Sequence, residues 1–311
     1  MSLRLRLLSA TLRHLVKPRL ARLYDPVRGR RELSVAARLL VPAPRGVAVS
    51  MTNTSPRIVR VVPPDARTDA AILYFHGGGY IAGSPETHRA LIGALARISG
   101  LAVFAPDYRL APEHPFPAAW DDAQAAWEMV LGQGFRPDRL LLGGDSAGGG
   151  LALSLLARLC GTGTPPAGAF AFSPWTDLAG RGASIRTNAG SDAFLPAARL
   201  PDLTGFVLAG HPADDPRASP VCAAYPQCPP LLLFASRSEI LLDDSRALAA
   251  RLAAEGAPVT LSLGDGLPHA WPAFAGLLPE AMDTIRDAAA FARRTLGLSA
   301  PPQRSAWSVS R

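Results

Sequence analysis

The chain of 311 residues is 48% hydrophobic and 18% charged, a balance that excludes a disordered protein and predicts a globular one. Its apolar runs fall well short of the ~20 residues that cross a bilayer, so we expect no transmembrane segment. The net charge of +7 comes from residues 1–31, which hold nine basic residues and one acidic residue. The rest of the chain is nearly neutral and shows no basic surface with interleaved aromatic residues, so we expect no nucleic-acid partner.

Residues 1–44 form a basic arm in which Leu5, Leu8, Leu12 and Leu15 recur at helical spacing. Three interpretations are open. A basic amphipathic helix can lie on a membrane surface, an Arg-rich and acid-poor segment can direct a protein to an organelle, and a helix can pack its leucines on the rest of the protein. We favour the third, with the charged face in solvent, and we expect no stable membrane insertion.

Beyond the arm, short apolar stretches alternate with helix-like ones. The strand candidates are two stretches within 46–62, then 71–75, 101–105, 140–142, 169–172, 231–235 and 259–263. The helix candidates are 88–98, 118–131, 147–159, 243–255 and 280–296. Apolar strands that alternate with amphipathic helices predict an α/β protein with a mostly parallel, eight-stranded sheet flanked by helices on both faces.

Two regions break this alternation. One is the arm, and the other is 177–217, which is long for a structureless connection and carries its own helical patterns. We interpret both as parts of a helical cap beside a catalytic domain formed by 45–176 and 218–298. We expect the tail, residues 299–311, to be disordered.

The stretch GGDSAGGG, residues 143–150, joins a strand candidate directly to a helix candidate. Gly144 and Gly148, on either side of Ser146, would let the two elements crowd together in a tight bend from which the hydroxyl projects. This arrangement fits G-x-S-x-G, the nucleophile elbow. A phosphate-binding interpretation fails, because no Lys follows as in a Walker loop and no acid lies about 20 residues on as in a dinucleotide site.

A serine nucleophile needs a base, and the base needs a carboxylate. In a sheet of this kind the working groups follow the carboxyl ends of strands. His269 follows the last strand by six residues, and we predict it as the base in preference to His211 in the cap and His14 in the arm. For the acid, Glu239 comes first after the preceding strand, and Asp243, one turn later at the start of a helix, is the alternative.

The negative charge of a tetrahedral intermediate needs backbone N–H donors. One donor is expected directly after the serine, and the second source is expected in the loop after the 71–75 strand, where three glycines leave amides unobstructed. The predicted oxyanion hole therefore consists of Gly77, Gly78, Gly79 and Ala147. Two neighbours are expected to support the site: His76 by holding the glycine loop in shape, and Asp145 by structural hydrogen bonds at the elbow.

The order of oxyanion glycines, serine, acid and histidine, each after a strand, matches the α/β-hydrolases. Over roughly residues 45–297 the chain resembles the hormone-sensitive-lipase-like family of that fold, which includes bacterial carboxylesterases and acetyl esterases. The resemblance rests on HGGG at 76–79, DYRLAPEHPFPAAWDD at 107–122, GDSAGG at 144–149 and LPH at 267–269.

By this resemblance Ser146 is the nucleophile, His269 is the base, and the amides of Gly78, Gly79 and Ala147 donate to the oxyanion with Gly77 beside them. The family acid maps onto Glu239, where Asp is more usual, and Gly150 stands where Asn is common. The family also builds its cap from an N-terminal segment and an insertion after the sixth strand, which fits the arm and residues 177–217.

The resemblance implies a serine carboxylesterase that hydrolyses short- to medium-chain acyl esters through an acyl-enzyme on Ser146, with no metal and no cofactor. The expected partner is a small-molecule ester, and a homodimer stays open. Lactone hydrolysis and deacetylation on the same triad are alternatives. So are a non-catalytic binding protein on this fold, against which the presence of His269 argues, and a lipase held at a membrane surface by the arm.

Three cysteines, Cys160, Cys222 and Cys228, show no metal-ligand spacing. Their odd number and the lack of a secretory signal pattern favour free thiols. We therefore expect the protein in a reducing cytoplasm.

Overall fold

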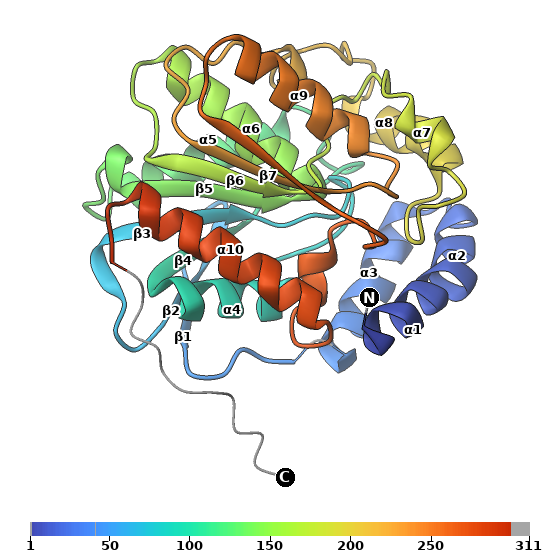
Figure 1. Cartoon of the computed structure of the whole chain (residues 1–311), viewed down its shortest axis with the longest axis horizontal. Helices are drawn as coiled ribbons and strands as arrows, with labels where there is room; N and C mark the ends of the chain where they lie inside the picture. Colours follow the sequence, from blue (N-terminus) through green and yellow to red (C-terminus); the bar gives the residue numbers. More distant parts are fainter. Residues whose placement is uncertain (1, 41, 300–311) are drawn as a thin grey trace.

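An eight-stranded sheet runs through the centre of the protein (Figure 1). The computed structural model describes residues 2–40 and 42–299, so the expected disorder of 299–311 lies, apart from Ser299, outside the described residues. The strands are β1 Ala48–Met51, β2 Arg57–Val62, β3 Arg67–Phe75, β4 Leu101–Asp107, β5 Leu140–Asp145, β6 Gly168–Phe172, β7 Leu231–Ser236 and β8 Val259–Gly264.

The strand order is β1-β2-β4-β3-β5-β6-β7-β8. The first two strands are antiparallel to their neighbours, and all pairs from β4 to β8 are parallel. All eight predicted strands are present, each at or close to its expected position. Because β3 and β5 are neighbours in the same direction, with Phe75 opposite Gly144, the loops that follow them meet at the carboxyl edge of the sheet.

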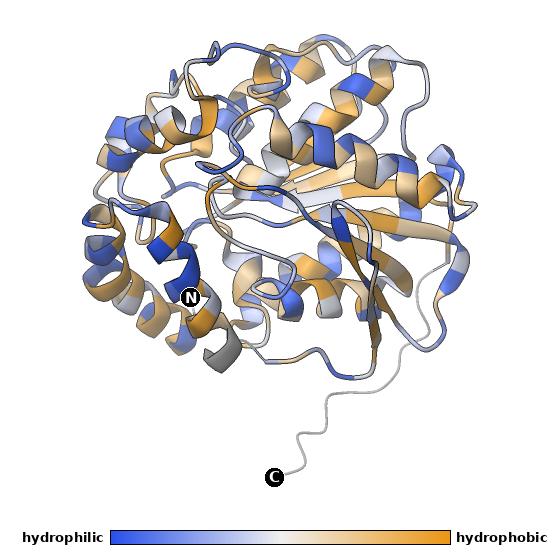
Figure 2. Ribbon diagram, turned by 180° about the vertical axis from the view of Figure 1, so that it is seen from behind, coloured by the Kyte–Doolittle hydropathy of each residue, from blue (hydrophilic) through white to orange (hydrophobic). Residues whose placement is uncertain are grey.

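Helices cover both faces of the sheet (Figure 1). On one face lie α4 Arg89–Ser99 and α10 Pro279–Thr295, and on the other α5 Ala118–Leu131, α6 Ser146–Gly161 and α9 Leu242–Ala254. Alternate residues of a strand serve the two cores: Leu73 packs with α5 and α6, whereas Ile72 packs with α4 and α10. In Figure 2 the central strands are coloured mostly as hydrophobic, while the surrounding helices mix both kinds of residue.

The arm folds into α1 Leu3–Thr11, a π-helical turn η1 Leu12–Val16, α2 Lys17–Ala21 and α3 Pro26–Leu40. These helices lie beside the segment between β6 and β7 (Figure 1), which holds α7 Ser184–Thr187 and α8 Leu200–Leu208. Single 3₁₀ turns complete the structure at η2 Pro137–Arg139, η3 Ala197–Arg199, η4 Pro220–Cys222 and η5 Trp271–Phe274. Within the described ranges no helix is long and apolar enough to cross a membrane.

The packing interpretation of the arm is correct for its inner leucines and wrong for the last one. Leu5 and Leu12 are buried, and Leu8 is half-buried against the core. Leu15 is 68% exposed. The reason is the π turn at 12–16: its wider turn rotates the chain less per residue than the ~100° of an α-helix, so Leu15 does not come round to the buried side.

Candidate active site

Ser146 stands at the corner between β5 and α6 with a left-handed φ of 53°, a conformation that costs a non-glycine residue free energy. The corner is held by close backbone packing. A Cβ on Gly144 would lie within 3.0 Å of the Gly148 carbonyl oxygen. A Cβ on Gly148 would lie within 3.0 Å of the carbonyl oxygens of Phe75 and His76. Gly144 therefore permits the close approach of strand and helix that the sequence predicted, and Gly148 permits a contact with the end of β3 that the sequence did not predict.

Ser146, His269 and Glu239 form a continuous chain of hydrogen bonds. The Ser146 Oγ lies 2.8 Å from His269 Nε2, and His269 Nδ1 lies 2.6 Å from Glu239 Oε2. The imidazole is 2% exposed and the Glu239 side chain is fully buried. Each residue follows a parallel strand, β5, β8 and β7 respectively, which is why residues so far apart in sequence meet at one edge of the sheet.

The alternative candidates lie elsewhere. Asp243, in the first turn of α9, accepts a hydrogen bond from the Ser184 amide and contacts Arg246. His211 packs edge-on against a phenylalanine, with 5.3 Å between ring centroids. His14 is exposed on the π turn of the arm. Of the residues considered as acid or base, the structure brings Glu239 and His269 to the serine.

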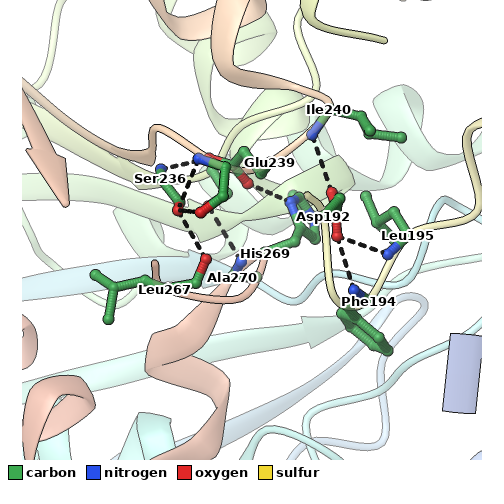
Figure 3. Close-up of polar contacts among 12 residues, drawn as sticks. Asp192, Phe194, Leu195, Ser236, Glu239, Ile240, Leu267, His269 and Ala270 are labelled. Carbon is green, nitrogen blue, oxygen red and sulfur yellow. Dashed lines mark hydrogen bonds and ion pairs between the residues drawn. The ribbon is translucent and has the colours of Figure 1, made fainter. Parts of the chain in front are cut away.

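Glu239 is fixed by its second oxygen as well. Its Oε1 accepts from the Ser236 amide at 2.8 Å, and the Ser236 hydroxyl donates to the Leu267 carbonyl at 2.7 Å (Figure 3). On the other side of the histidine, the Ala270 amide donates to the Ser173 hydroxyl. The Ser236 bond joins the end of β7 to the loop that carries the histidine, and the Ser173 bond joins that loop to the end of β6, so two serine hydroxyls fix the histidine loop between the neighbouring strands.

The electrostatic surroundings of His269 favour its charged form. Burial opposes the imidazolium, but the hydrogen bond and charge of Glu239, together with the charges of Asp192 and Asp145, outweigh burial and raise the pKa of His269 above its ordinary value of 6.5. An imidazole of raised pKa is a stronger proton acceptor, as a base that deprotonates a serine needs to be.

The glycine loop after β3 presents two of its three amides. Gly78 and Gly79 have φ values of +126° and +63°, which glycine adopts readily. Among the hydrogen bonds of the described residues, the amides of Gly78, Gly79 and Ala147 have no protein acceptor. The Gly77 amide differs from the prediction, because it donates to Asp145 Oδ1 at 3.1 Å and is not available to a ligand.

Asp145 is the structural centre beneath this loop. Besides the Gly77 amide it accepts from the Tyr74 hydroxyl at 2.8 Å and lies 3.3 Å from His88 Nε2. Burial opposes its ionisation, but the charge and hydrogen bond of His88 outweigh burial and lower the pKa of Asp145. From the sequence His88 is only the start of a helix, since nothing there pairs it with a residue 57 positions away.

His76 supports the loop, as expected, and is not placed to act as a base. Its ring stacks on Tyr108 with 4.2 Å between centroids, its Nδ1 lies 2.9 Å from the Gly77 carbonyl, and its own carbonyl accepts from the Tyr108 hydroxyl. Burial and the nearby His88 lower its pKa to about 4, although hydrogen bonding and nearby carboxylates oppose them. His76 is therefore neutral at pH 7.

Gly150, the position where Asn is common, lies against backbone. A Cβ there would lie within 3.0 Å of the Trp175 carbonyl oxygen. The Trp175 amide in turn donates to the Ser146 carbonyl at 2.9 Å. In this chain the loop after β6 occupies the space that a larger side chain would need.

A feature that sequence analysis missed is the segment 188–192, which contacts the acid loop directly. Asp192, 1% exposed, accepts at one oxygen from the Ile240 amide and at the other from the amides of Phe194 and Leu195 (Figure 3). Asn188 donates to the carbonyls of residues 237 and 239, and Ser191 donates to that of residue 238. The composition of 177–217 gave no signal for this role, because the contacts join two segments about 50 residues apart.

Comparison with known proteins agrees with this geometry. A model of the α/β-hydrolase fold family matches residues 72–273. An acetyl-hydrolase of Streptomyces hygroscopicus is 42% identical over 255 residues, which cover 82% of this chain and 84% of the relative. The esterase LipU of Mycobacterium tuberculosis is 35% identical over 275 residues, 84% of this chain and 92% of the relative.

Solved structures agree as well. The esterase EstE5 superposes with a TM-score of 0.90 at 36% identity, over 96% of this chain and 100% of that one. An esterase described as a member of the bacterial hormone-sensitive lipase family superposes at 0.89 and 36% identity, over 96% and 99%. The sheet order, the elbow and these matches define an α/β-hydrolase. Within that class, the chain belongs to the hormone-sensitive-lipase-like esterases, and it is a carboxylic ester hydrolase.

Proposed function

We propose that this protein is a serine carboxylesterase whose nucleophile is Ser146, whose base is His269 and whose acid is Glu239. The observation that carries this assignment is the unbroken pair of hydrogen bonds, 2.8 Å from serine to histidine and 2.6 Å from histidine to glutamate. The acid of the triad is Glu239, because Asp243 bonds to another helix.

In acylation, Ser146 Oγ attacks the ester carbonyl carbon while His269 Nε2 takes the hydroxyl proton. Glu239 keeps the other imidazole N–H in place and stabilises the imidazolium that forms. The imidazolium then donates its proton to the leaving alcohol oxygen as the C–O bond breaks. In deacylation, His269 takes a proton from water, the hydroxide attacks the acyl-enzyme, and the proton returns to Ser146.

The oxyanion of each tetrahedral intermediate is held by the amides of Gly78, Gly79 and Ala147, which lack protein acceptors among the described residues. Gly77 serves the same loop differently, by tying it to Asp145. An amide that points at a developing negative charge stabilises it by about 3 kcal/mol. No step of this mechanism needs a metal or an organic cofactor.

The cap consists of the arm, residues 1–44, and of the insertion 177–217. In support, Leu203 of α8 lies against the oxyanion loop, where it would contact a Cβ at Gly79. An apolar pocket reaches from the elbow helix to this cap, lined among others by Tyr80, Leu151, Leu178 and Val207. Its lining includes none of Ser146, His269 and the oxyanion residues, so support for a short- to medium-chain acyl ester comes from the relatives, which are named acetyl-hydrolase and esterase.

Hydrolysis of lactones and removal of acetyl groups use the same triad and are the alternative reactions. An ester panel of increasing acyl length, with lactones and acetylated amines included, distinguishes them. We expect the highest kcat/KM on p-nitrophenyl acetate or butyrate. A preference for long acyl chains or for lactones would overturn the substrate assignment.

The assignment of Ser146 is tested by Ser146→Ala and by labelling with an organophosphate. We expect the variant to lose turnover and the wild-type protein to gain one adduct on Ser146, found by peptide mass spectrometry. Turnover that persists in Ser146→Ala would refute the mechanism, and a protein that binds ligand without labelling would be a binding protein on this fold.

We further propose that the enzyme works in the cytoplasm, which fits three cysteines that are all free. Analytical ultracentrifugation distinguishes a monomer from a homodimer.

A further inference from the structure

The N-terminal helices expose hydrophobic side chains to an unusual degree. Six of the nine large hydrophobic residues that stand exposed in the described part of the chain belong to this segment: Leu3, Leu7, Leu15, Tyr24, Leu33 and Val35. Single exposed hydrophobic residues are ordinary, but a cluster marks a contact surface. Figure 2 shows hydrophobic and strongly hydrophilic residues side by side on these helices at the edge of the molecule.

Three of these leucines lie on one line, away from the core. Leu3 and Leu7 are one helical turn apart, so they share a face, and they are 69% and 61% exposed. The π turn keeps Leu15, 68% exposed, close to that line instead of rotating it toward the core. The buried stripe of Leu5 and Leu12 lies on the other side of the helix. The first helix thus has two apolar stripes, of which one is buried against the core and the other is exposed.

Arginines flank the exposed stripe on both sides. Arg4 follows Leu3 and Arg6 precedes Leu7, each rotated by about 100° from its neighbour. Within the described residues, neither guanidinium has a hydrogen bond or ion pair. The same holds for Arg22, on the next helix end, and for Arg31.

Five other cations of the arm have partners within the described residues, and two of these, Arg19 and Arg28, pair with Glu32 of the arm itself at the surface. Arg13 and Lys17 donate to backbone carbonyls of residues 189–192, and Arg30 pairs with Glu113. The arm therefore divides its charge between contacts that hold it in the fold and a set that faces outward with the leucines.

We propose that this leucine–arginine face, made of Leu3, Arg4, Arg6, Leu7 and Leu15, docks the enzyme on an anionic lipid surface. Leucine side chains gain free energy by entering the acyl boundary of a bilayer, and arginines by approaching negative headgroups. A nucleic acid would satisfy the arginines alone, and an uncharged apolar partner the leucines alone. A bilayer with anionic headgroups satisfies both.

Docking on this face leaves the fold intact. The exposed stripe is separate from the leucines that pack on the core, and the carbonyls held by Arg13 and Lys17 stay in place. Through those carbonyls the arm is bonded to the segment that holds the acid loop, so the docked helix and the active site belong to one packed unit. The enzyme would then work where apolar esters accumulate.

The test is sedimentation of the full chain with vesicles of phosphatidylcholine, with and without phosphatidylglycerol. We expect binding to the anionic vesicles at low salt and its loss at about 0.5 M NaCl, where charges are screened within a few ångströms. The pair Arg4→Gln and Arg6→Gln should weaken binding by roughly 30-fold. The triple variant Leu3→Ser, Leu7→Ser and Leu15→Ser should abolish it.

The matched control is the pair Val49→Ser and Met51→Ser on β1, whose side chains are 56% and 57% exposed but carry no role in the proposal. This pair should bind vesicles as the wild type does, and all variants should hydrolyse soluble p-nitrophenyl butyrate at the wild-type rate, which reports an intact fold.

Two results would overturn the proposal. One is a wild-type protein that never sediments with anionic vesicles, or a leucine variant that sediments with them as well as the wild type does. The other is a leucine variant that turns a dimer into a monomer without any vesicle binding in the wild type, which would make this face an interface between two copies. Either result leaves the esterase mechanism untouched, because the soluble assay reads it separately.

Discussion

Asp192 lies outside the triad, yet its replacement by Asn should slow the enzyme and shift its pH profile. The carboxylate accepts three backbone amides, those of Phe194, Leu195 and Ile240, at 2.7, 2.9 and 2.9 Å. An asparagine keeps one accepting oxygen. If that oxygen stays on the first two amides, its NH₂ group faces the Ile240 N–H, and a buried donor is left unpaired next to Glu239.

An unpaired buried donor costs about 1–3 kcal/mol. If the acid loop relaxes to avoid that cost, Glu239 moves relative to His269, and the loss appears in the transition state. Each 1.4 kcal/mol is about tenfold in rate, so we expect kcat/KM to fall by roughly 5- to 140-fold, mostly in kcat. Removal of the Asp192 charge also lowers the pKa of His269, because that charge helps to raise it.

The assay is kcat/KM for p-nitrophenyl butyrate across pH, with thermal unfolding as the check on folding. The ascending limb of Asp192→Asn should lie at lower pH than that of the wild type. Asp202→Asn is the control, because Asp202, also between β6 and β7, pairs with Arg199 at the surface and has no hydrogen bond to the acid loop. A folded Asp192→Asn enzyme with wild-type rates and an unmoved limb would refute the reasoning.

Four further predictions concern the triad acid, the pH profile, the elbow and a buried acid. Glu239→Gln should lower kcat by about 10⁴-fold, as loss of the triad carboxylate does in serine proteases. In the wild type, kcat/KM should rise with pH and reach half its maximum above pH 6.5, because His269 works unprotonated and its pKa is raised. A pH–rate series measures both effects, and a wild-type midpoint below 6.5 would contradict the second prediction. Gly148→Ala should lower the unfolding temperature and the activity, because the added Cβ would lie against two carbonyl oxygens. Gly161→Ala on the same helix is the control and should be neutral, because its Cβ would contact nothing within 4 Å. Equal unfolding temperatures for the two variants would refute the packing argument. Burial raises the pKa of Asp244 to about 7, although two backbone amides oppose it. The protonated side chain therefore stabilises the fold at low pH, and this contribution is lost between about pH 4 and 7, by at most about 1.4 kcal/mol per pH unit. In urea unfolding, the free energy of unfolding of Asp244→Asn relative to the wild type should rise with pH, and a difference that does not change with pH would count against the raised pKa.

The strands and the chemistry-bearing residues could be predicted because their signals are local. Buried parallel strands are continuous apolar runs, and the tight elbow demands small residues on both sides of Ser146, so the pattern follows directly from the geometry. Glu239 and His269 could be found because parallel strands all end at the same edge of the sheet, so residues that directly follow such strands lie near one another in the fold.

What could not be predicted depends on contacts between distant segments. The hold of Asp192 on the acid loop involves backbone amides, which leave no trace in residue type. The Gly77 amide was assigned to the oxyanion hole because its neighbours have the same sequence environment, and only the position of Asp145 distinguishes it. Leu15 was misplaced because a π turn has no sequence signature of its own.

Arg13 and Lys17 hold the segment after α7 solely through main-chain oxygens. A carbonyl is offered by every amino acid, so residues 189–191 can be exchanged without weakening this attachment. Variation at those positions can alter the surface beside the acid loop, where Ser191 donates to the carbonyl of residue 238, while the arm keeps its hold. Replacement of residues 177–217 by the matching segment of a relative should therefore succeed as long as the arm keeps Arg13 and Lys17.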